Sequence, residues 1–132
     1  MRVVLDTNIL VAAGFNPRSS AARIVEAARR GDLTAVWHAS TRAESRLILD
    51  KIPPLDWAHF ADLFDPTHEH TGPLDTGAFA EVSDPDDRKY AALAAAMNAI
   101  LVSNDAHLLS IRDALPITVR TSQELARDLP GP

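Results

Sequence analysis

The stretch MRVVLDTNIL (residues 1–10) places polar side chains directly after a short apolar segment. Residues 2–5 are typical of a buried β-strand, because they are largely β-branched and bounded by polar residues. Asp6, Thr7 and Asn8 then bring an acid, a hydroxyl and an amide to one point of the chain. Taken alone, Asp6 is explained equally well by a turn at the end of the strand and by a functional site.

The composition is that of one globular domain. The chain has 132 residues, of which 46% are hydrophobic, with no cysteine and a formal net charge of −5. We expect a single domain over residues 1–128 and a C-terminal tail over 129–132. The absence of cysteine, of a signal peptide and of a membrane-length apolar run predicts a cytoplasmic protein without membrane contact. The acidic balance argues against a general nucleic-acid binder, unless the acids gather around a cation.

Predicted helices and strands alternate along the chain. Strands are expected at 2–5, 33–37, 78–82, 99–103 and 117–120, and helices at 20–30, 41–51, 55–64, 85–98, 105–112 and 121–129. Apolar strands that alternate with helices indicate an α/β fold in which a central parallel sheet is covered by helices on both faces.

Four acids fall where a site of such a fold is expected. Asp6 and Asp105 each follow a predicted strand, while Glu44 and Asp87 lie in the first turns of predicted helices. In open parallel sheets, ligands bind outside the carboxyl ends of the strands. We therefore expect these four carboxylates, from four separate segments, to converge at one edge of the sheet.

Each acid also has a simpler explanation. Glu44 fits a capping box with Thr41, and Asp105 could cap its own helix. Asp84, Asp86 and Asp87 favour a helix N-terminus electrostatically. The shared placement at one sheet edge is what favours a functional site.

Converged carboxylates repel one another unless a cation joins them. Oxygen ligands without cysteine or a histidine cluster suit Mg²⁺ or Mn²⁺. Such ions activate water and stabilise the leaving oxygen of a phosphodiester. The pattern therefore predicts a metal-dependent hydrolase.

The same residues resemble a known family. VVLDTNILVAA (3–13), TRAESRLIL (41–49), DPDDRKYAALAAA (84–96) and ILVSNDAHLL (100–109) resemble, in that order, the PIN-domain ribonucleases. Within that family, they are most similar to bacterial VapC-like proteins regarded as toxins of toxin–antitoxin pairs. The resemblance covers roughly residues 2–125. LDTN alone is a weak motif, whereas the last two motifs in sequence are considerably more specific.

The resemblance implies a three-layer sandwich of helices around a parallel sheet, and endoribonuclease activity that leaves 5′-phosphate and 3′-hydroxyl ends. Asp6, Glu44, Asp87 and Asp105 match the four family acids, which would hold one or two Mg²⁺ or Mn²⁺ ions. It also implies an RNA substrate, an inhibitory antitoxin protein and a homodimer. Alternatives are an RNA-processing nuclease outside a toxin system and a non-catalytic PIN-like scaffold.

Supporting residues follow from the same positions. Thr7, Asn8 and Ser103 would orient the acids. Cations that could contact RNA phosphates adjoin two of the acids, and they are Arg42, Arg46, Arg88 and Lys89. Pairing with neighbouring acids is at least as good an explanation for any one of these cations.

The sequence departs from the family pattern at two positions. His107 stands where a further acid is common, which leaves the number of metal ions open. Asn98 stands where a glycine commonly ends the helix, and asparagine also adopts the left-handed conformation. Neither position is one of the four acids.

Overall fold

A four-stranded parallel sheet forms the centre of the molecule, in a computed structural model that describes residues 1–130. The strands are β1 (Arg2–Leu5), β2 (Thr34–Ala35), β3 (Ile100–Val102) and β4 (Val119–Arg120). Their order across the sheet is β2-β1-β3-β4, and every pair is parallel. β1 and β3 are therefore the two central strands, and Leu5 lies opposite Val102 at their carboxyl ends.

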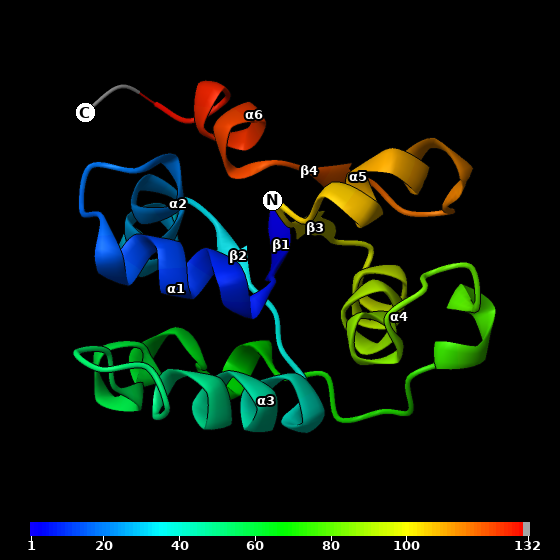
Figure 1. The fold of residues 1–132 in the computed structure, drawn as a ribbon, viewed down its shortest axis with the longest axis horizontal. Helices are drawn as coiled ribbons and strands as arrows, with labels where there is room; N and C mark the ends of the chain where they lie inside the picture. The colour runs from blue at the N-terminus through cyan, green and yellow to red at the C-terminus, as the bar shows by residue number, and fades with distance from the viewer. Residues whose placement is uncertain (131–132) are drawn as a thin grey trace.

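Within residues 1–130, six α-helices surround this sheet (Figure 1). They are α1 (Thr7–Phe15), α2 (Ser20–Arg30), α3 (Ala39–Leu49), α4 (Arg88–Met97), α5 (Ala106–Ile111) and α6 (Ser122–Arg127). Side chains of successive strand residues point to opposite faces of a sheet. Accordingly, Val4 and Leu101 pack with α4 and α5, whereas Val3 and Val102 pack with α1, α2 and α6. The expected α/β fold, a central parallel sheet between layers of helices, is confirmed.

Several predicted boundaries agree closely with the structure. β1 spans the predicted residues, and α2 begins after the Ser19 cap and ends at Gly31, which has a φ of 84°. Asn98 ends α4 in the left-handed conformation, with a φ of 50°. Thr121 and Glu124 form a capping box at the start of α6. Local side-chain chemistry thus fixes these helix ends.

Helix α1 was not expected from the sequence. Its residues are apolar almost all round, so they show no polar face to mark a helix. Ile9 packs toward the sheet and α2, whereas Leu10 packs toward α2, α3 and Leu55. A helix buried on several sides has the same apolar sequence as a buried strand, which explains the omission.

Replacing Leu10 by alanine tests the burial of α1. Leu10 is 1% exposed, and we expect its truncation to lower the free energy of unfolding by about 3 kcal/mol. Leu47→Ala is the matched control, because Leu47 is 57% exposed, and its effect should stay within about 0.5 kcal/mol. Urea unfolding measures both; equal losses for the two variants would contradict this account of α1.

Two other segments differ from the prediction. The helix predicted over 55–64 is a pair of 3₁₀ turns, Trp57–His59 and Ala61–Leu63, because Phe60 between them leaves the helical region with a φ of −120°. The strand predicted over 78–82 is wrong. Phe79 and Val82 are both buried there, at a three-residue spacing that suits the 3₁₀ helix Thr76–Phe79 and the turn after it better than a strand.

The capping of α3 also differs from the prediction. His38 is the N-cap and forms a capping box with Thr41, so Thr41 does not cap the helix through Glu44. The carboxylate of Glu44 is consequently available for contacts outside its own helix.

The C-terminal part of the chain continues past α6. Leu129 packs against the cluster that contains Leu125, while residues 131–132 of the predicted tail lie outside the described part of the chain. No helix within residues 1–130 is long and apolar enough to cross a membrane.

Candidate active site

The carboxyl ends of the two central strands bring Asp6 and Asp105 to the same edge of the sheet. Asp6 directly follows β1 and caps α1 by accepting a hydrogen bond from the Asn8 backbone N–H. Asp105 follows β3 after two residues and caps α5, where it accepts from the backbone N–H groups of His107 and Leu108. Asp105 therefore has the capping role that its position suggested, whereas Asp6 caps a helix that was not expected, and both acids follow central strands at the same edge of the sheet.

Ser103 lies between these two acids. Its hydroxyl donates to Asp6 Oδ2 at 2.9 Å, and its Oγ accepts from the Asp105 backbone N–H at 3.1 Å. Asp6 is only 6% exposed. Burial raises the pKa of the Asp6 carboxyl, the Ser103 and Asn8 hydrogen bonds oppose this rise, and the charges of Glu44 and Asp105 add to it. A buried carboxylate held at fixed orientation is suited to bind a cation.

Asp87 lies at the start of α4, near enough to Asp6 for their charges to interact. It ends the 3₁₀ turn Pro85–Asp87 and is half-buried, whereas Asp84 and Asp86 are exposed. Burial, followed by the charges of Asp6, Asp84, Asp105 and Glu44 in that order, raises the pKa of Asp87 to about 7. The acid that the sequence singled out from the three is thus the one that interacts electrostatically with all the other predicted site acids.

Glu44 reaches the same region from α3, but its carboxylate already has two partners. Lys89 Nζ donates to Oε1 at 2.8 Å, and the Tyr90 hydroxyl donates to Oε2 at 2.5 Å. Burial and the hydrogen bond to Glu44 raise the pKa of Tyr90 above its ordinary value, so its hydroxyl keeps its proton. Glu44 is therefore anchored to the first turn of α4.

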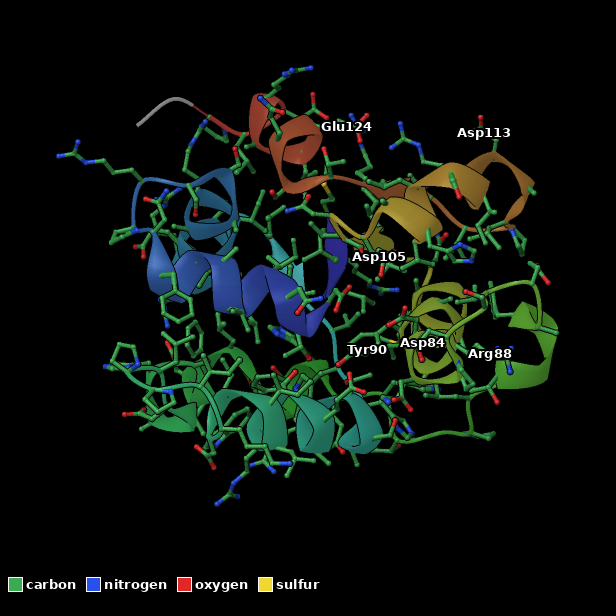
Figure 2. The ribbon with its side chains drawn as sticks, in the orientation of Figure 1. Asp84, Arg88, Tyr90, Asp105, Asp113 and Glu124 are labelled. Carbon is green, nitrogen blue, oxygen red and sulfur yellow. The ribbon has the colours of Figure 1, made fainter. Side chains whose placement is uncertain are left out.

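Three hydroxyl groups connect this anchor to the start of α1. Thr7 Oγ1 lies 2.8 Å from Ser45 Oγ and 2.7 Å from the Tyr90 hydroxyl, and all three residues are buried. Tyr90 lies between α4 and the start of α1 in Figure 2. The network ties α1, α3 and α4 together beneath the acids. Sequence reasoning missed Ser45 and Tyr90 as site residues; the lysine–aromatic pair after Asp87 was the available signal.

Removing the Tyr90 hydroxyl should weaken this junction. For Tyr90→Phe, we expect a loss of about 1 kcal/mol in the free energy of unfolding, since a buried hydroxyl and its hydrogen bonds are lost. Ser110→Ala is a control, because the Ser110 hydroxyl bonds the His107 carbonyl at an exposed position. Urea unfolding measures both. A Tyr90→Phe variant as stable as the parent would mean that the hydroxyl network does not hold the helices together.

The other residues predicted near the acids differ in their contacts and exposure. Thr7 contacts Ser45 and Tyr90, and Asn8 is exposed and supports Asp6 only through its backbone. His107 is exposed beside Asp105.

The predicted cations mostly have protein partners. Arg42 stacks over the Trp57 ring, Arg88 donates to backbone carbonyls of Val82 and Ala80, and Lys89 pairs with Glu44. Arg46 is exposed. These contacts leave Arg46 as the predicted cation that is most open to solvent.

The donor chemistry of this edge fits a hard divalent cation. Asp6, Asp87, Asp105 and Glu44 offer carboxylate oxygens, and their charges raise the pKa values of Asp6 and Asp87, an effect that a cation would reverse. As the side chains stand, no three histidine, aspartate or glutamate residues within 1–130 are grouped closely enough to share one ion. Glu44 is held at its position by the ion pair with Lys89 and the hydrogen bond from Tyr90.

Comparison with known protein families identifies the family to which the fold belongs. The family profile of the PIN domain matches residues 2–107. The chain belongs to the PIN-domain family. The four predicted site acids lie within the matched residues.

Two solved structures share the PIN fold. One is the crystal structure of VapBC2 from Rickettsia felis bound to a DNA fragment from their promoter, with a TM-score of 0.60, 20% identity, and coverage of 92% of this chain and 98% of that chain. The other is FitAB bound to an IR36 DNA fragment, with a TM-score of 0.61, 14% identity, and coverage of 91% and 94%. At these identities, the likeness concerns the fold alone. A search of curated proteins gives no match.

Proposed function

We propose that this PIN domain is an endoribonuclease that depends on Mg²⁺ or Mn²⁺. The observation that carries the proposal is the placement of four acids from four segments near enough for their charges to interact, with Asp6 buried and Asp87 half-buried where the central strands end. Structural acids are normally paired with cations or solvated. Acids that destabilise one another in a half-buried cluster are typical of functional sites.

In this proposal Asp6, Glu44, Asp87 and Asp105 hold one or two divalent ions. When bound, such ions activate water and stabilise the leaving oxygen of the phosphodiester. Ser103 keeps Asp6 oriented, and the α5 backbone N–H groups keep Asp105 oriented. Asp87 must lose its proton before it can bind a cation, so its raised pKa makes metal affinity dependent on pH.

RNA binding needs cations near the acids, because the chain as a whole is acidic. Arg46 is exposed on α3 and is the predicted cation most open to solvent, so we propose it as a phosphate contact. Arg42, Arg88 and Lys89 could contribute after exchanging their present partners. The proposed location is the cytoplasm, where RNA is available.

A toxin role is the best biological setting for this activity. The resemblance to VapC-like toxins and the fold shared with VapBC2 and FitAB support it. An inhibitory antitoxin protein would then be the partner, and a homodimer the assembly. Induced expression of the chain alone should arrest bacterial growth, while the Asp6→Asn variant, expressed equally, should not. Equal growth of the two cultures would argue for a PIN nuclease outside a toxin system.

Cleavage of RNA tests the proposed activity directly. Purified protein should cut single-stranded or structured RNA in Mg²⁺ or Mn²⁺ and leave 5′-phosphate ends, and EDTA should abolish cutting. The 5′ ends can be identified by their susceptibility to a 5′-phosphate-dependent exonuclease. Metal-independent cutting would contradict the proposed metal dependence, and no cutting of any RNA tried would favour the non-catalytic scaffold.

A further inference from the structure

Lys89 pairs with one of the four acids inside the site. Lys89 Nζ lies 2.8 Å from Glu44 Oε1, and the two side chains are only 19% and 20% exposed. Within residues 1–130, this is the one ion pair between a cation and any of Asp6, Glu44, Asp87 and Asp105. A partly buried pair is screened by solvent far less than a surface pair.

The position of this pair connects it to the rest of the cluster. Lys89 is two residues from Asp87 on the first turn of α4, and Glu44 is near enough to Asp6 and Asp87 for their charges to interact. Tyr90 holds the other carboxylate oxygen of Glu44, and Thr7 holds Tyr90. Glu44 would therefore keep an anchor if Lys89 were withdrawn.

We propose that Lys89 and the divalent cation compete for Glu44, so that Lys89 sets the cation affinity of the site. The inference rests on the proposed function. Without a cation, the ammonium of Lys89 neutralises Glu44. With a cation bound, the same ammonium adds repulsion and turns away from Glu44, which leaves it available to an RNA phosphate. Tyr90 retains Glu44 in both states.

A purely structural ion pair between α3 and α4 makes a different prediction. Loss of such a pair would loosen the junction and weaken both folding and cation binding. Competition instead predicts that loss of the Lys89 charge lowers the stability of the metal-free protein but strengthens cation binding. The same charge stabilises the metal-free protein and opposes the cation. The two effects can be measured separately.

Lys89→Met provides the test, with Lys51→Met as its matched control. These are the two lysines of the chain, and Lys51 is exposed in the turn that follows α3. In EDTA, we expect Lys89→Met to lower the melting temperature. In calorimetric titrations with MnCl₂, Lys89→Met should lower the dissociation constant about tenfold, since a positive charge is removed from the neighbourhood of the bound cation. Lys51→Met should change neither quantity.

Two further variants complete the design. Lys89→Arg keeps the charge and should bind Mn²⁺ within about twofold of the parent. Lys89→Gln is used if Lys89→Met does not fold, and it should tighten binding in the same direction. Unchanged or weaker Mn²⁺ binding by the neutral variants overturns competition while leaving the proposed function intact, provided that the parent binds Mn²⁺ and Asp6→Asn does not. A parent that binds no Mn²⁺ overturns both.

Discussion

Replacing Asp6 by asparagine should lower the rate of RNA cleavage by about a hundredfold to a thousandfold, the usual effect of removing one preorganised electrostatic contact from an active site. Asp6 is buried at the end of the central strand, and Ser103 fixes one of its oxygens. Asparagine keeps the shape and can still cap α1, so the change removes mainly the charge. Single-turnover cleavage of a labelled RNA in Mg²⁺ measures the effect.

Asp86→Asn is the matched control for this substitution. Asp86 is exposed and adjoins Asp87, so the control removes the same charge from the same sheet edge without touching the buried acids. We expect its cleavage rate to stay near that of the parent. Equal losses for both variants would indicate a general effect of surface charge, and an active Asp6→Asn variant would remove Asp6 from the catalytic set.

The stability of the metal-free protein should fall as the pH rises from about 4 to about 7. The pKa of Asp87 is raised to about 7, so between its unfolded value of 3.8 and 7 the folded protein holds a proton that the unfolded chain has lost. Stability therefore decreases with pH across this window and levels off above it. The raised pKa of Asp6 acts in the same direction. Urea unfolding in EDTA at several pH values measures the trend.

Mn²⁺ should reverse this loss, and more so at pH 8 than at pH 6, because the cation binds the ionised carboxylates. At a free concentration of 100 times its dissociation constant, it should add about 2.7 kcal/mol. The Asp87→Asn variant should show a flatter pH profile in EDTA and a smaller gain from Mn²⁺, whereas Asp86→Asn should behave as the parent does. A pH profile identical in all three proteins would show that Asp87 is not the titrating group.

The parts of the fold that were predictable from the sequence are those fixed by local chemistry. The Ser19 and Gly31 ends of α2 and the capping box at Thr121 depend on neighbouring residues alone, and β1 is recognised by its short apolar run. Helix α1 was hidden, because its burial between α2 and α3 removes the polar face by which a helix is recognised. The short turns between α3 and α4 follow the packing of Phe60 and Phe79, which the sequence does not reveal.

The candidate site also has parts that the sequence predicts and parts that only the packing of the helices decides. Asp6 and Asp105 could be placed because the ends of parallel strands meet at one edge of a sheet. The partners of Glu44 could not be placed, because Lys89 and Tyr90 are 45 and 46 residues away in sequence. Their contact depends on how α3 packs against α4. The Thr7–Tyr90 bond, across 83 residues, is likewise visible only in the folded chain.

The most direct test of the central claim is the anomalous scattering of manganese in a crystal of the protein grown or soaked in MnCl₂. The account predicts a peak at the carboxyl edge of the sheet, ligated by Asp6 and by carboxylates from the segments of Asp87, Asp105 and Glu44, and its loss in the Asp6→Asn variant. Absence of a peak among these acids at saturating Mn²⁺ and pH 8, or a peak that survives in the variant, would contradict it.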